Sequence, residues 1–219
     1  MCGKFTQMFD WQGLHALYAL SSGPAVIGTP MRFATVIRLS ENGLRQAVQM
    51  RWGFSKINAT SPGAKPDHIH ARAETIDEKP TFRDAFRSRR GLLMVSSFNE
   101  AREITPTKFE QQIITPDDGA PLAIAVLWEG WEHANGDTLL TFVMVTTPPN
   151  ALIGTITDRM PAIVRAEDHA RWLGEEPASP AELKALLKAN ESAMTMRPER
   201  KATEKPAKAK PALTQGSLF

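Results

Sequence analysis

The chain has 219 residues, of which 42% are hydrophobic, so its length allows one sizeable core and would leave each of two domains small. Its only cysteine is Cys2, which excludes an intramolecular disulfide, and no apolar run approaches the roughly 20 residues that cross a bilayer. No basic stretch near the N-terminus leads into a long apolar run, so we expect a cytoplasmic protein without a membrane role.

The net charge of +2 hides an asymmetry along the chain. Residues 195–219 hold six lysines and arginines against two glutamates, a net charge of +4 that leaves −2 on the first 194 residues. A body with this balance can bind nucleic acid only through a local basic patch. Because the end of the chain has almost nothing apolar to bury, we expect a folded domain over residues 1–192 and a disordered basic tail over residues 193–219.

Hydrophobic spacing predicts the first elements of the chain. Apolar residues from Trp11 to Tyr18 follow Asp10 at helical spacing, which predicts a short N-capped helix over about residues 11–20. Short apolar or β-branched runs between turn residues predict strands over residues 33–39, 44–54, 92–97, 122–127 and 139–146. The expected fold class is therefore α+β, a single compact β-rich domain with peripheral helices, and nothing in the sequence indicates an assembly larger than a monomer.

Two further helices have sequence signals of their own. The first is predicted to begin at Pro80, with Phe82 and Phe86 on its packing side. A basic stripe follows beside them, formed by Arg83, Arg87 and Arg90. The second begins at residues 179–182, where the letters SPAE form a capping box with proline at the first helical position. Its apolar side is formed by Leu183, Leu186 and Leu187.

Cys2 directly follows the initiator methionine, and removal of Met1 would leave an α-amine and a thiol on one residue. Such a 1,2-aminothiol traps aldehydes. The amine, with a pKa of roughly 8, forms a Schiff base, and the thiol, with a pKa of about 8.5, then closes a five-membered thiazolidine ring. The alternative is that a lone cysteine at position 2 has no role, and the segments that follow it decide between the two readings.

Five segments resemble, in order, motifs of the SOS response-associated peptidase (SRAP) family. MCGKF at residues 1–5 resembles the family's MCGRF, and RWGF at residues 51–54 resembles its RWGL. ARAET at residues 71–75, followed by EKP and FR, resembles its NARAET…EKP.FR. AVLWE at residues 125–129, before another tryptophan, resembles AGLWE.W, and DRMP at residues 158–161 matches HDRMP.

This resemblance covers residues 1 to about 175. It implies a compact β-rich α+β domain whose N-terminal cysteine crosslinks to an abasic-site aldehyde in single-stranded DNA and so shields the lesion from strand cleavage. No metal or cofactor is implied. His68 and His70 could suggest a metal pair, but no Cys or further His lies at ligand spacing from them.

The chain departs from the family at two of the four usual active-site positions. His70 stands where the family has Asn before ARAET, and Thr157 stands where it has His before DRMP. SFNEA at residues 97–101 replaces GWYEW, so that Glu100 is kept while its aromatic neighbours are lost. The resemblance thus implies Cys2 as nucleophile and Glu100 as acid and base, with two altered auxiliary positions.

Each of these residues also has a plainer interpretation. A carboxylate at Glu100 can accept the proton of the α-amine and return it to the sugar oxygen, or it can be an exposed residue at a strand end. A threonine hydroxyl does not titrate near pH 7, so Thr157 is expected to hold a hydrogen bond at best. His70 replaces the lost histidine if its position faces Cys2, and otherwise fills the place of Asn through hydrogen bonds.

For DNA, the matching motifs predict sequence-independent and salt-sensitive phosphate contacts. The candidate residues are Lys4, Arg72, Arg83 and Arg159. Trp52 is a candidate for stacking on a base, and a place in the core is its alternative.

Three functions stay open at the level of sequence. The first is a covalent sensor of abasic sites in the DNA damage response, associated with the nucleoid when bound to DNA. The second is a diverged DNA-binding module of the same fold that has lost efficient chemistry. The third, a cysteine peptidase, follows from the family name and ranks lowest because the partner histidine is missing; hydrolase, protease and lyase are the corresponding enzyme classes.

Overall fold

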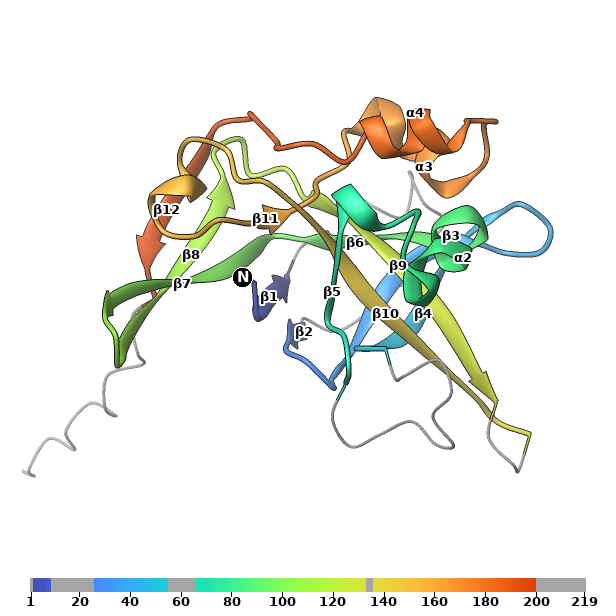
Figure 1. Cartoon of the computed structure of the whole chain (residues 1–219), viewed down its shortest axis with the longest axis horizontal. Helices are drawn as coiled ribbons and strands as arrows, with labels where there is room; N and C mark the ends of the chain where they lie inside the picture. Colours follow the sequence, from blue (N-terminus) through green and yellow to red (C-terminus); the bar gives the residue numbers. More distant parts are fainter. Residues whose placement is uncertain (1, 9–25, 55–65, 133–135, 200–219) are drawn as a thin grey trace, which may run out of the picture.

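The computed structural model describes residues 2–8, 26–54, 66–132 and 136–199, and its strands form two sheets (Figure 1). One is five-stranded, in the order β12-β8-β7-β1-β2, and the other is seven-stranded, in the order β11-β10-β4-β3-β6-β9 with β5 also paired to β10. The strands of the five-stranded sheet are β1 (Lys4–Gln7), β2 (Val26–Gly28), β7 (Ser97–Thr105), β8 (Lys108–Pro116) and β12 (Met194–Pro198). Those of the seven-stranded sheet are β3 (Phe33–Leu39), β4 (Arg45–Trp52), β5 (His70–Arg72), β6 (Arg90–Val95), β9 (Leu122–Glu132), β10 (Thr138–Thr147) and β11 (Met160–Pro161).

The seven-stranded sheet is barrel-like, because β10 pairs with β9 as well as with β4. Closure removes the free edges that an open sheet would expose. The five predicted strands are confirmed, within a few residues, as β3, β4, β6, β9 and β10. Their apolar runs are nearly continuous because both faces are covered: along β10, Phe142 and Met144 belong to one buried cluster, and Val143 and Val145 belong to the other.

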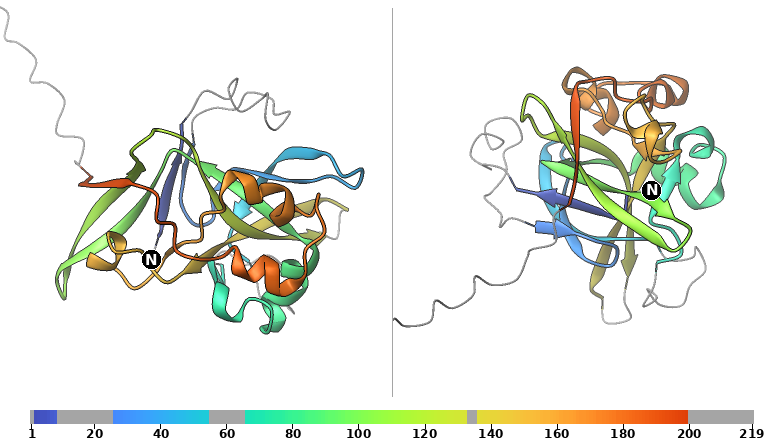
Figure 2. Two further views of the ribbon diagram at one scale, coloured as in Figure 1. Left: turned by 90° about the horizontal axis from the view of Figure 1, so that it is seen from above. Right: turned by 90° about the vertical axis from the view of Figure 1, so that its left-hand side faces the viewer.

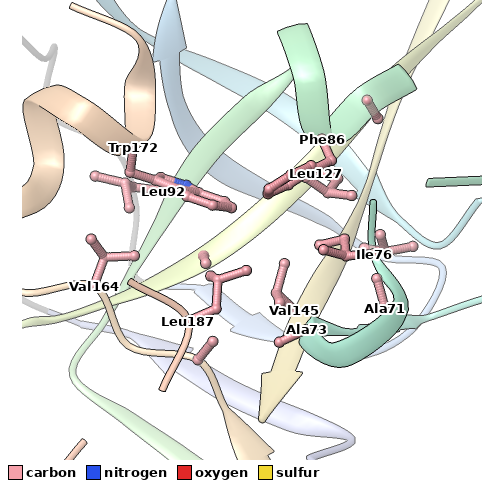
Figure 3. Packing of buried hydrophobic residues seen from close by; sticks show 14 of the residues in the cluster. Ala71, Ala73, Ile76, Phe86, Leu92, Leu127, Val145, Val164, Trp172 and Leu187 are labelled. Atoms are coloured by element: carbon pink, nitrogen blue, oxygen red, sulfur yellow. The ribbon is translucent and has the colours of Figure 1, made fainter. Parts of the chain in front are cut away.

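Helices cover the second of these clusters. They are α2 (Pro80–Ser88), α3 (His169–Leu173) and α4 (Pro180–Ala185), with short 3-10 turns η1 (Ala73–Thr75), η2 (Ile153–Thr155) and η3 (Ala166–Asp168). Figure 3 shows Phe86 and Trp172 from two of these helices packed with Leu92 and Leu127 of the sheet. None of the described helices is both long enough and apolar enough to span a membrane.

Both predicted helices with their own start signals are confirmed, with two corrections. The capping box at Ser179 is present, but α4 ends at Ala185, so the leucines that follow lie beyond it. The predicted basic stripe is wrong in its last member. Arg90 lies on β6, and its guanidinium donates inward to Trp172 O (2.6 Å) and Phe86 O (2.8 Å).

The predicted tail also begins too early. Residues 194–198 form β12, which pairs with β8 over five residue pairs, so the folded part extends past residue 192. Figure 2 shows β12 along the outer edge of the five-stranded sheet. The helix expected over residues 11–20 and the chain from residue 200 onward lie outside the described residues.

One buried side chain fastens β1 to the barrel. β3 and β6 pair at Ile37 and Leu92, and the next opposed residues would be Thr35 and Met94. The amide of Gln7 lies between them instead: it donates to Thr35 O and Met94 O, each at 2.9 Å, and accepts from Thr35 N at 3.1 Å. Gln7 therefore replaces a missing step of the ladder and fixes the strand that follows Cys2.

Candidate active site around Cys2

Cys2 is buried at the entrance to β1, with 1% of its surface exposed. Its thiol donates to Lys4 O at 3.3 Å. Burial raises the pKa of the thiol to about 12, and the negative charge of Glu100 adds to this rise. The thiol is therefore protonated at neutral pH, and a reaction through its sulfur needs a group that accepts the proton.

β1 is held in place on both of its sides. It pairs with β2 and with β7, and the ring of Phe5 covers the backbone of Gly28 so closely that a Cβ there would come within 1.9 Å of the ring. Glycine at position 28 thus lets the two strands approach each other. Together with the Gln7 amide, this packing sets where the start of β1, and with it Cys2, can lie.

Glu100 lies on β7, where the strand passes the start of β1. Strand alternation puts it on the same face as Phe98, toward the cluster that contains Cys2, and it is 1% exposed. Burial raises the pKa of its carboxyl, the charge of Asp158 adds to the rise, and the backbone N–H of Cys2 opposes it. The exposed strand-end interpretation of Glu100 is therefore wrong.

His70 begins β5 and lies beside both Trp52 and Cys2. Its ring meets the indole edge-on, with centroids 5.9 Å apart. Burial lowers the pKa of the imidazole to about 4, while the backbone of Cys2 is close enough to act in the opposite direction. Both ring nitrogens are shielded from solvent, and the backbone of Cys2 is a hydrogen-bonding group that acts on the ring. The imidazole is thus neutral at pH 7 and has acceptor capacity to spare.

Thr157 lies on the loop between η2 and β11. It is half-buried, and its backbone N–H donates to Ile153 O at 3.1 Å. Its neighbour Asp158, a residue of the DRMP segment to which the sequence gave no role, is the one whose charge reaches Glu100. Asn99 was missed as well: it is buried, its side-chain Nδ2 has no partner among the described residues, and its backbone N–H acts on the thiol of Cys2.

Two of the predicted DNA contacts are corrected by burial. Trp52 is 0% exposed, donates from Nε1 to Ile69 O at 2.9 Å and stacks on Phe142, so it is a core residue without a face to offer a base. The guanidinium of Arg159 is buried and forms two bonds to the carboxylate of Glu74, at 2.5 and 2.8 Å, so it is an internal cation and not a free phosphate ligand.

The other three predicted contacts lie nearer the surface. Arg72 is exposed, and Arg83 is exposed beside Asp84 at 3.5 Å. Lys4 is half-buried and forms an ion pair with Glu199. Among the described residues, no group of three or more His, Cys, Asp or Glu side chains has the arrangement of a metal site.

Fold and site together define a class: a β-rich domain with one cysteine at position 2, buried at the start of the first strand beside a glutamate and a histidine. The chain belongs to the SRAP family, since it matches the family described as SOS response associated peptidase over residues 1–206.

Named relatives agree with this assignment. The abasic site processing protein YoqW of Bacillus subtilis is 30% identical over 195 residues, which cover 85% of this chain and 86% of that protein. The abasic site processing protein HMCES of Xenopus tropicalis is 26% identical over 166 residues, or 65% of this chain and 50% of that protein.

Solved structures agree in fold. A protein from Bordetella bronchiseptica has a TM-score of 0.77 at 21% identity, with 91% of this chain and 100% of that one covered. One from Bacteroides thetaiotaomicron has a TM-score of 0.76 at 22% identity, with 99% and 100% covered. The predicted α+β, β-rich fold is confirmed.

Proposed function

We propose that this protein processes abasic sites in single-stranded DNA by forming a thiazolidine between Cys2 and the sugar aldehyde. The observation that carries the proposal is the meeting of a cysteine at position 2 with two buried titratable groups, Glu100 and His70. Membership of the SRAP family and relatives named for abasic site processing support the same substrate.

The chemistry requires removal of Met1, so that Cys2 carries both the amine and the thiol. The amine adds to C1′ of the open-chain sugar, and loss of one water molecule gives the Schiff base. The sulfur then adds to the imine carbon as the thiol proton leaves and the imine nitrogen gains a proton. One water is released overall, no oxidant is consumed, and the amine is no longer available to promote elimination and strand cleavage.

Glu100 and His70 divide the proton transfers between them. The raised pKa of Glu100 keeps more of its carboxyl protonated near neutral pH, so it donates to the sugar oxygen as the ring opens and to the departing water. The neutral imidazole of His70 accepts the thiol proton as the sulfur bonds to the imine carbon, the stage at which this proton becomes strongly acidic and a base of low pKa can take it. His70 in this way takes the role that the family gives to the histidine before DRMP, where this chain has Thr157.

A diverged binding module is the second candidate, and the burial of Cys2 favours it. A thiol with a pKa near 12 reacts slowly unless a neighbouring base acts on it. In that case the protein would bind the same DNA without a covalent product.

The test is a denaturing gel with single-stranded DNA that carries one abasic site. The expected result is a heat-stable adduct with protein that begins at Cys2, and none with a form that retains Met1, as verified by mass spectrometry. Cys2→Ala keeps an α-amine, so it should yield an adduct only when borohydride reduces the Schiff base. If the processed wild type gives no adduct and yet shifts the same DNA on a native gel, the binding module is the correct function.

A further inference from the structure

A row of directly opposed residues crosses four strands of the five-stranded sheet near Cys2. Lys4 on β1 opposes Asn99 on β7, Asn99 opposes Ile113 on β8, and Ile113 opposes Arg197 on β12. Opposed residues of an antiparallel pair project from the same face, so these four side chains share one face, the one opposite to that of Phe98 and Glu100. Glu199 follows two residues after Arg197 and so returns to that face.

The chain end is held against this row by backbone and side chain together. The backbone N–H of Glu199 donates to Gln111 O at 2.7 Å, which extends the pairing of β12 with β8 by one step. The carboxylate of Glu199 forms an ion pair with the ammonium of Lys4, with 26% and 30% of the two side chains exposed. The carboxylate of Glu199 thus neutralises the charge of Lys4, which lies two residues after Cys2.

The side chain of Asn99 is a second observation, independent of this ion pair, that indicates a ligand. It is 2% exposed, it neighbours Lys4 on the shared face, and its Nδ2 has no partner among the described residues. A buried N–H donor without an acceptor is costly and uncommon in folded proteins. An ammonium and an unfilled amide donor side by side are suited to an anion with several acceptor oxygens, which a carboxylate satisfies only in part and a phosphate satisfies better.

Lys4 is a phosphate contact that the matching motifs already predict; we propose that the Asn99 amide completes this site for a DNA phosphate next to the abasic nucleotide, and that the carboxylate of Glu199 occupies the site until DNA displaces it. The inference rests on the proposed function, because Cys2 supplies the reason why a lesion should lie here. The C-terminal strand is then a brake on DNA binding. It lowers the affinity for single-stranded DNA in general, because a phosphate must first displace the carboxylate of Glu199 from Lys4.

The test measures binding of intact single-stranded DNA without abasic sites to protein in the Cys2→Ala background, so that no chemistry contributes. Glu199→Gln is expected to tighten the dissociation constant about three- to fivefold, the range of a partly exposed ion pair. Glu175→Gln is the matched control, because Glu175 pairs with Arg45 at 2.6 Å with similar exposure, 25% and 23%, and belongs to neither strand of the proposed site. It should leave the affinity unchanged.

Two further sets of measurements, with variants of the site and with altered DNA, identify the site and its ligand. Lys4→Gln should weaken binding and remove the gain from Glu199→Gln when the two are combined, and Asn99→Leu should weaken binding by a similar factor. With abasic DNA and intact Cys2, a neutral methylphosphonate on one side of the lesion should remove the Glu199→Gln gain, which separates a DNA phosphate from free phosphate. Equal affinities of wild type and Glu199→Gln would overturn the inference.

The outcomes separate the inference from the proposed function. Crosslinking by the wild type with no effect of Glu199→Gln leaves the abasic-site chemistry standing and removes the brake. A tighter Glu199→Gln complex without any crosslinking leaves the phosphate site standing and removes the chemistry.

Discussion

The loss of stability on replacing Gln7 can be predicted from the hydrogen bonds of its side chain. Gln7→Met keeps the length of the side chain and removes three hydrogen bonds, to Thr35 O, Thr35 N and Met94 O. Each bond contributes about 1 kcal/mol, and the three buried backbone groups left without partners add to the cost, so we expect a loss of about 3 to 6 kcal/mol in the free energy of unfolding. For a chain of this size the melting temperature would fall by roughly 10 °C or more.

The assay is urea denaturation followed by fluorescence, with Gln49→Met as the control. Gln49 makes one side-chain bond, to the hydroxyl of Thr35 at 2.7 Å, and lies near the surface, so its loss should cost less than about 1 kcal/mol. At temperatures where Gln7→Met is still folded, its crosslinking yield should also fall, because β1 carries Cys2. A cost for Gln7→Met no larger than that for Gln49→Met would refute the argument that this amide completes the ladder.

Three further predictions concern the site and the DNA surface. Burial holds the pKa of His70 at about 4 in the folded protein, below the ordinary 6.5. Between these two pH values the unfolded chain therefore binds more protons than the folded protein. The contribution of His70 to stability is thus full above pH 6.5 and is lost as the pH falls toward 4. His70→Asn should remove up to about 3 kcal/mol of this acid sensitivity in pH-dependent denaturation, and an unchanged difference from wild type would contradict the burial of the ring. His70→Asn should also slow crosslinking at least about tenfold, and adding Thr157→His should restore it; no recovery in gel time courses would show that the two positions are not interchangeable. Arg159→Lys should lower the melting temperature without changing the salt dependence of DNA binding, whereas Arg72→Gln should leave stability intact and reduce the slope of log K against log salt by about 0.7; the reverse pattern would restore Arg159 as a phosphate ligand.

The barrel explains why the strands could be predicted and the β7–β8 hairpin could not. Runs such as Leu122–Glu132 are apolar because both of their faces are covered, and a short apolar run between turn residues predicts a strand from the sequence alone. The hairpin is exposed from Arg102 to Phe109, so its sequence has little apolar periodicity, although its two strands follow one another in the chain. For the same reason β12 looks like a basic tail, since its stability comes from the edge of β8 and not from its own residues.

The sequence by itself determined the family, and it supplied the candidate reactive residue and the two altered positions, because these depend on which residue types stand in order along the chain. Only the tertiary structure decided what each side chain meets. In the folded protein Trp52 is a core residue and Arg159 pairs with Glu74. His70 and Cys2 lie side by side, although they are far apart in sequence. Exposure and charge pairing are set by neighbours from distant strands, and no single segment of the chain carries that information.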